Sequence, residues 1–158
     1  MNALQRRVLE LAAGELGVRV EMYQAAAGGV PGEPYCVDFI IWCFKEAVHE
    51  LNVEMPLPVV RSAVRLWQQT DPWTHWHAPS PGSIFVHDHG GGLGHAGLVE
   101  AVRGDGTMLT IEANTSPSPG VPRTDRDGDG VYRRHDRRVD DHRLIIGQGF
   151  IDVSRQRA

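Results

Sequence analysis

The sequence contains no apolar run long enough to cross a bilayer, which takes about 20 residues. It also lacks a strong charge bias, and a net charge of -4 gives no bulk attraction for nucleic acid or for an anionic membrane. The N-terminal segment has no continuous apolar stretch of the secretory-signal kind, because Arg6, Arg7 and Glu10 interrupt it. These absences predict a protein that is made in the cytoplasm, does not insert into a membrane and does not bind nucleic acid.

The length of 158 residues is enough for one domain with a sizeable core and too short for two. Hydrophobic residues make up 41% of the chain and charged residues 23%, as in ordinary globular proteins. Neither an internal repeat nor a domain boundary is apparent, so residues 1–158 are expected to form a single domain. The segment 114–129 is expected to be a flexible loop within it.

Apolar periodicity predicts helices in the first half of the chain and strands in the second. A first helix is expected from Leu4 to Leu16, with Asn2 as its cap and Gly17 as its stop. A second is expected from about Tyr35 to Leu51 and a shorter one over residues 59–69. Short β-rich segments follow at 82–88, 95–102, 106–114, 130–136 and 144–153. This order predicts an α+β domain with an antiparallel sheet.

The two cysteines, Cys36 and Cys43, are seven residues apart within the second expected helix. That spacing separates them by about 10 Å along the helix axis. A disulfide needs Cα atoms within roughly 7 Å, and structural zinc sites use a closer cysteine spacing. Neither a disulfide nor a cysteine zinc site is therefore expected.

The two positions differ in their surroundings. Cys43 lies mid-helix between Trp42 and Phe44, where a cysteine behaves as a small buried hydrophobe. Cys36 follows Pro34 at the start of the helix, where unpaired N–H groups and the helix dipole favour the thiolate. The plain alternative is a buried, inert cysteine at a helix start.

A base for Cys36 can be sought in the segment "GHAGLVEAVRGDGTMLTIEAN", which reads as a β-hairpin. With a two-residue turn inside "RGDG", His95 lies on the same face as Glu112 and Asn114. A turn at Gly104 and Asp105 would set Asn114 opposite His95 and Glu112 on the diagonal. A histidine beside a carboxylate or amide is the base-and-orienter part of a nucleophilic site. The alternative is a surface cross-strand pair, and a bulge near the turn would break the face assignment.

Other histidines and acidic residues offer competing sites. His87 and His89, with His95, His75 and His77 nearby, allow a zinc-dependent hydrolase as an alternative, but no H-E-x-x-H motif accompanies them. We interpret His87 and His89 as solvated loop residues. Asp125, Asp127, Asp129, Gly130 and Asp136 resemble the spacing of a calcium loop, but the flanking segments are not helical, so a turn is favoured over a calcium site. The patch "RRHDRR" is interpreted as a solvated edge, with binding to anionic wall polymers as a weaker option.

The blocks "PYCVDFIIWCF", "GHAGLVEAV" and "LTIEANTS" together resemble the CHAP domains, cysteine- and histidine-dependent amidohydrolases and peptidases related to the NlpC/P60 group. The resemblance implies a papain-like fold that cleaves amide bonds in peptidoglycan, as an amidase or an endopeptidase, without a metal or other cofactor. It implies Cys36 as nucleophile and His95 as general base. Glu112 would orient the imidazole, with Asn114 assisting or sharing that role.

The chain departs from the family pattern in two respects. Many phage-lysin members carry glutamine before the cysteine, where this chain has Tyr35, which leaves the second oxyanion donor unassigned. No wall-binding repeat accompanies the domain. The expected setting is a phage lysin, or a toxin delivered into rival cells and paired with an immunity protein. An inactive, CHAP-like wall-binding domain is the non-enzyme alternative, against which the presence of Cys36, His95 and Glu112 argues.

Overall fold

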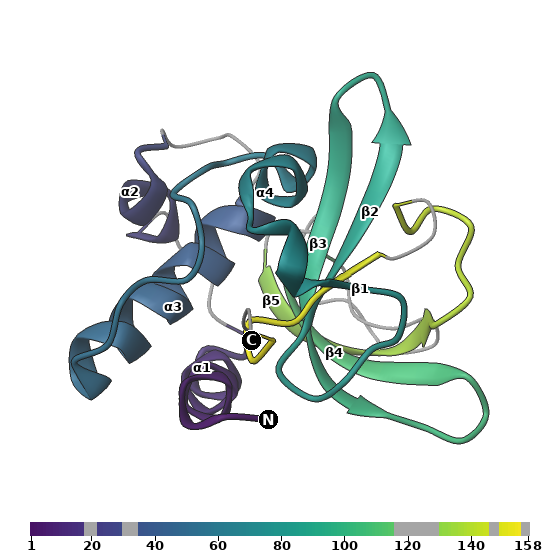
Figure 1. Ribbon diagram of the computed structural model, residues 1–158, viewed down its shortest axis with the longest axis horizontal. Coiled ribbons are helices and arrows are strands. Elements are labelled where there is room, and N and C mark those ends of the chain that lie inside the picture. Colours follow the sequence, from purple (N-terminus) through teal and green to yellow (C-terminus); the bar gives the residue numbers. More distant parts are fainter. Residues whose placement is uncertain (18–21, 30–34, 116–129, 146–148, 156–158) are drawn as a thin grey trace.

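The computed structural model describes residues 1–17, 22–29, 35–115, 130–145 and 149–155 (Figure 1). Its helices are α1 (Ala3–Gly14), α2 (Met22–Ala27), α3 (Cys36–Leu51) and α4 (Ala63–Gln69), followed by the 3-10 turn η1 (Pro72–Thr74). Its strands are β1 (His75–Trp76), β2 (Ile84–Gly90), β3 (Leu93–Val102), β4 (Thr107–Thr115), β5 (Gly130–Arg138) and β6 (Phe150–Ile151).

The strands form one sheet in the order β1-β6-β2-β3-β4-β5, and all neighbouring pairs are antiparallel. The helices lie beside this sheet, with α4 next to the β2–β3 hairpin (Figure 1). The predicted α+β class, with helices first and an antiparallel sheet after them, is confirmed. Among the described residues, no helix is both long enough and apolar enough to cross a membrane.

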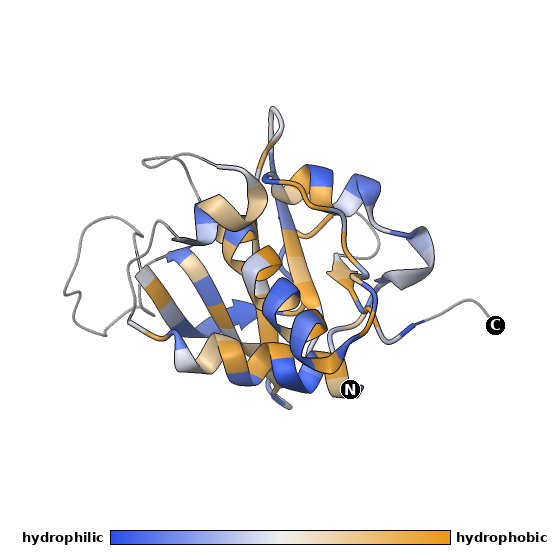
Figure 2. Ribbon diagram, turned by 90° about the vertical axis from the view of Figure 1, so that its left-hand side faces the viewer, coloured by the Kyte–Doolittle hydropathy of each residue, from blue (hydrophilic) through white to orange (hydrophobic). Residues whose placement is uncertain are grey.

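The first half of α3 is the centre of the core. Nearly every side chain from Cys36 to Phe44 is buried, whereas the last turns carry exposed polar residues such as Glu46 and His49. The helix packs on α1, α2, β3 and β4. In Figure 2 the helices alternate between apolar and hydrophilic segments, as expected of helices with one buried face. A helix start held this firmly is a rigid support for a functional side chain.

Several predicted boundaries differ from the structure. The first helix stops at Gly14, before Gly17, although its predicted cap is present: Asn2 and Gln5 form a reciprocal capping box. Helix α4 starts only at Ala63, because the Ser62 side chain caps it. The six-residue α2 occupies part of a segment that the sequence suggests is a connection. Most of the expected loop 114–129 lies outside the described residues.

The β3–β4 hairpin has two irregularities that offset each other. Its turn contains three residues, 104–106, with Gly106 at φ 82°, instead of the expected two. Val102 therefore faces Met108, one residue away from the expected register. An extra residue in β3, Glu100, then shifts the pairing back, so that Val99 faces Thr110. Beyond this bulge, β3 and β4 have the register that a Gly104–Asp105 turn would have given.

Candidate active site

Cys36 is the first residue of α3 and is almost fully buried, with 7% of its surface exposed. Burial by itself raises the pKa of its thiol, but three features outweigh it and lower that pKa. These are a hydrogen bond with the His95 ring, the charge of that ring, and backbone N–H groups of Ala96 and Val37 near the sulfur. Cys36 therefore favours the thiolate, the nucleophilic form of cysteine.

Cys43, two turns along the same helix, has the opposite chemistry. It is completely buried, and this burial raises the pKa of its thiol well above the ordinary value. Both cysteines are free thiols, as the seven-residue spacing predicts. The interpretation of Cys43 as a core residue is confirmed by its burial.

His95 lies on β3 and connects Cys36 to Glu112 on β4. Its Nε2 is 2.7 Å from the Glu112 carboxylate, which leaves the other ring nitrogen, Nδ1, for Cys36. Burial alone would lower the pKa of His95, but the hydrogen bonds with Cys36 and Glu112 raise it to about 9. The structure thus brings together Cys36, His95 and Glu112 in the order thiol, imidazole and carboxylate. The pair Cys36–His95 is set up as a thiolate and an imidazolium.

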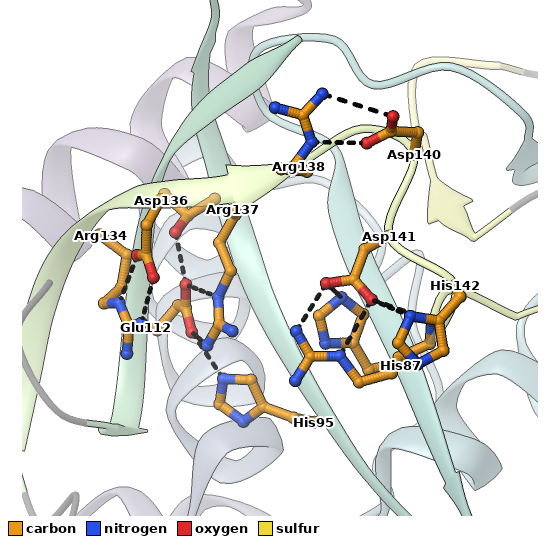
Figure 3. A network of polar contacts seen from close by, with 12 residues as sticks. His87, His95, Glu112, Arg134, Asp136, Arg137, Arg138, Asp140, Asp141 and His142 are labelled. Atoms are coloured by element: carbon orange, nitrogen blue, oxygen red, sulfur yellow. Dashed lines mark hydrogen bonds and ion pairs between the residues drawn. The ribbon is translucent and has the colours of Figure 1, made fainter. Parts of the chain in front are cut away.

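Glu112 is fully buried and its two oxygens accept several hydrogen bonds. Arg137 of β5 donates to both oxygens at 2.5 and 2.9 Å, and the Thr110 hydroxyl donates to one of them (Figure 3). Burial would raise the pKa of this carboxyl, but the bonds from Arg137 and His95 hold it well below its usual range. Glu112 therefore remains ionised and fixed beside His95.

Arg137 is a residue that the sequence did not single out. The interpretation of "RRHDRR" as a solvated edge is wrong at this position, because only 12% of the Arg137 side chain is exposed. The residue lies opposite the turn end of β4 and reaches the carboxylate because register shifts in β4–β5 place it there. Its guanidinium also lies over the Phe85 ring, 5.5 Å from the centroid. The signal available in the sequence was only that a buried carboxylate needs a cation.

Gly97 makes room for the Glu112 carboxylate. A Cβ atom at this position would lie 2.6 Å from Cγ of Glu112 and 2.5 Å from the Phe85 ring. Real Cβ atoms do not approach other atoms that closely, so any side chain here would displace both neighbours. Gly97 thus helps to define where Glu112 can lie relative to His95.

His87 is buried, so its interpretation as a solvated loop histidine is wrong. It belongs to β2, directly opposite His95, and is covered by the segment around Leu144, with which it forms a bridge. Burial lowers the pKa of His87 to about 3, and the nearby Arg137 charge adds to the effect. His87 is therefore a neutral core residue. His89, two residues on, is exposed as expected.

Two residues named by the family resemblance have other surroundings. Asn114 is at the end of β4, half-buried, with φ 53°, beside a register shift. His95 Nε2 donates to the Glu112 carboxylate, and a role for Asn114 stays a prediction. Tyr35, which stands where many relatives have glutamine, is buried and its ring stacks on Tyr23 with centroids 6.3 Å apart. Its side chain belongs to the packing around the helix start.

The alternative metal sites find little support in the described part of the chain. No group of three His, Cys, Asp or Glu side chains there is placed to hold a metal ion. His75 stacks on Trp67 with centroids 3.8 Å apart, and His77 lies against Trp76. Asp125, Asp127 and Asp129 lie outside the described residues. Asp136, at the last position of the hypothetical calcium loop, forms an ion pair with Arg134.

A cleft of about 630 Å³ opens beside Cys36. One wall is made by the segment that leads into α4, with Val59, Val60 and Arg61, and by Arg65 in the first turn of α4, and the other by the β2–β3 hairpin around Leu93. A substrate lying in this cleft would have access to the Cys36 sulfur. The arrangement places a thiolate-favouring cysteine in a groove, with an imidazole and an ionised carboxylate behind it, which is chemistry that nucleophilic catalysis can use.

Comparison with known proteins gives one match. The sequence model of the CHAP domain matches residues 26–114, which is more than half of the chain and includes Cys36, His95 and Glu112. Searches of curated proteins and of solved structures found no match.

Proposed function

Because the chain belongs to the CHAP domain family, we propose that it is a cysteine hydrolase that cleaves an amide bond in peptidoglycan. The family is one of peptidoglycan hydrolases, amidases and peptidases. The observation that supports the proposal best is the hydrogen-bonded series Cys36, His95 and Glu112 beside a cleft. The bond would be either the one between muramic acid and L-alanine or one within the stem peptide.

In the proposed reaction the Cys36 thiolate attacks the carbonyl carbon of the amide. The negative charge that develops on the carbonyl oxygen is stabilised by backbone N–H groups at the start of α3. The imidazolium of His95 gives its proton to the leaving nitrogen, so that the C–N bond breaks and a thioester forms on Cys36. His95, now neutral, takes a proton from water, which attacks the thioester and restores the thiolate.

Glu112 has an electrostatic and a positional role in this scheme. Its carboxylate holds the His95 ring through Nε2, so that Nδ1 points to Cys36, and it stabilises the imidazolium. Arg137 and Thr110 hold the carboxylate in turn. No cofactor or metal takes part in any of these steps.

The proposal is tested on purified peptidoglycan sacculi, with mass spectrometry of the released fragments. Fragments with newly freed muramic acid and L-alanine ends would show an amidase, and cuts within the peptide an endopeptidase. We expect the wild type to release fragments and Cys36→Ala to release none, while Cys43→Ala, the matched control on the same helix, remains active.

Two other results would contradict the proposal in different ways. Lysis that persists in Cys36→Ala and stops with a chelator would indicate a metal-dependent hydrolase. Sacculi that bind the wild type and release nothing would indicate a wall-binding domain.

The site of action we propose is the cell wall, reached after the protein is released or delivered from the cytoplasm where it is made. Two settings are consistent with this: a phage lysin and a toxin delivered into rival cells. Neighbouring genes distinguish them, since a holin gene indicates the first and a small periplasmic immunity protein the second. Versions of the protein that are directed to the periplasm should be toxic to the cells that make them, and versions kept in the cytoplasm should not.

A further inference from the structure

The cleft beside Cys36 carries positive charge in a chain whose net charge is negative. Arg61 and Arg65 both line it, and none of its lining residues in the described part of the chain is acidic. The remaining lining residues are small or aliphatic, and two of them, Val59 and Leu93, are strongly exposed at 51% and 71%. The groove thus combines a cationic side with apolar contacts.

Arg61 is held firmly in this groove. Its Nε is 3.6 Å from the carboxylate of Asp38, which is fully buried in the first turn of α3, two residues from Cys36. Gly29 lies against the same guanidinium, so closely that an added Cβ atom would be 2.5 Å from Nη2 of Arg61. The ion pair with a buried carboxylate and the contact with Gly29 restrict this guanidinium, which lowers the entropy cost of binding a ligand.

Arg65 is the more accessible of the two arginines. It lies in the first turn of α4, which Ser62 caps, and its side chain is exposed. A guanidinium presents two parallel N–H groups that match the two oxygens of a carboxylate. Beside Arg61 in the same groove, it gives the cleft a second cation for an acidic group.

We propose that Arg65, supported by Arg61, binds a carboxylate of the substrate close to the scissile amide, so that the enzyme prefers acidic peptides. This inference rests on the proposed amide hydrolysis and adds the substrate class. The exposed aliphatic side chains of Val59 and Leu93 would contact the uncharged part of the same peptide.

The test compares two stem-peptide substrates, one with free carboxylates and one in which these are amidated. For the wild type we expect kcat/KM to be about tenfold higher on the acidic peptide, which is the effect of one hydrogen bond to a charged group. Arg65→Gln should bring this ratio close to one, and Arg65→Glu should bring it below one. Arg6→Gln, on the exposed side of α1, removes the same charge and should keep the wild-type ratio.

A second measurement separates this inference from the proposed function. Cys36→Ala cannot form the thioester, so its affinity for each peptide is measured by calorimetry, together with Cys36→Ala/Arg65→Gln. Preference of Cys36→Ala for the acidic peptide, lost in the double variant, supports the subsite even where no cleavage is seen. Equal affinity for both peptides, or a preference that survives Arg65→Gln, would overturn it.

Arg61 is left unchanged in these experiments, because its removal would leave the buried Asp38 carboxylate without this cation. The wild-type preference should also weaken as salt is added, since Arg65 is exposed and its charge is screened. A preference that is independent of salt would argue against Arg65 as its source.

Discussion

Two histidines, the buried His87 and the partly buried His95, face each other across the β2–β3 hairpin, and each has a carboxylate and an arginine close by (Figure 3). His95 is 2.7 Å from the Glu112 carboxylate, and its pKa is raised to about 9. His87 is 4.0 Å from Asp141, and its pKa is lowered to about 3. Similar groups on opposite strands therefore hold one imidazole charged and the other neutral.

The two pKa values differ because the two carboxylates and the two imidazole rings have different hydrogen-bond partners. Glu112 bonds directly to His95, which has a second acidic partner in the Cys36 thiol. Asp141 is bound at both oxygens by Arg143 and lies beyond hydrogen-bonding distance of His87. Burial then dominates at His87, and burial favours a neutral imidazole. Proximity to an acidic residue is therefore not enough to raise the pKa of a histidine. A direct hydrogen bond to the carboxylate is needed.

The largest effect should come from removing the charged histidine. We expect His95→Gln to lower kcat/KM on sacculi by about 100- to 10,000-fold, because both proton transfers are lost. His87→Gln, the matched change on the facing strand, should leave most of the activity. Both variants are compared by circular dichroism to establish that they are folded. Equal losses in the two variants would remove the functional distinction between the histidines.

The next largest effect should come from weakening the Glu112–His95 contact, which has no counterpart at His87. Glu112→Gln keeps the shape but removes the negative charge, so the pKa of His95 should fall toward its ordinary value. The population of the thiolate–imidazolium pair should decrease, and kcat/KM at neutral pH should fall by about 10- to 100-fold. The alkaline limb of the pH–rate profile should also move to lower pH. An unchanged alkaline limb would mean that Glu112 does not set the charge of His95.

Arg137 can be tested by comparison with its neighbour Arg138. Arg137→Gln leaves the buried Glu112 carboxylate with fewer partners, which should cost about 2 to 3 kcal/mol of unfolding free energy, since His95 and Thr110 still bind it. Arg138 pairs with Asp140 on the surface, and Arg138→Gln should have no measurable effect on urea unfolding. If the two variants unfold alike, the buried pair contributes no more than the exposed one.

The smallest effect should be seen in the pH dependence of the free energy of unfolding, to which the neutral His87 contributes. The pKa of His87 is lower in the folded state, so the unfolded chain binds its proton first as the pH falls below about 6.5. The stability contribution of His87 is therefore complete above that pH and is lost as the pH falls toward 3. Between pH 6.5 and pH 5, His87→Gln should lose about 1 to 2 kcal/mol less stability than the wild type. Parallel curves from denaturant titrations would contradict the neutral assignment.

The sequence predicts the parts of the site that depend on local spacing. Helical periodicity placed Cys36 at a helix start, and the hairpin pattern put His95 and Glu112 on one face. That face assignment assumed an uninterrupted hairpin, and it holds because the Glu100 bulge compensates for the longer turn. The extra residue in the turn and the extra residue in the bulge offset each other, so the register beyond them is the expected one.

Contacts from distant segments could not be predicted in the same way. Arg137 reaches Glu112 across the β4–β5 pairing, whose register shifts twice. The burial of His87 depends on the segment at Leu144, far along the chain. Neither partner lies at a spacing that periodicity detects, because long-range register is set by packing. Helix α2 is short and alanine-rich beside glycines, where propensity alone gives a weak signal.

Gly97 gives the site a constraint that chemistry alone would not reveal. It carries no functional group, yet an added methyl group would meet the carboxylate that orients His95. In a library of all single substitutions selected for lysis, position 97 should therefore be as intolerant as the nucleophile itself. Many residues on the surface away from the cleft can be exchanged during evolution, but position 97 has no alternative to the smallest residue.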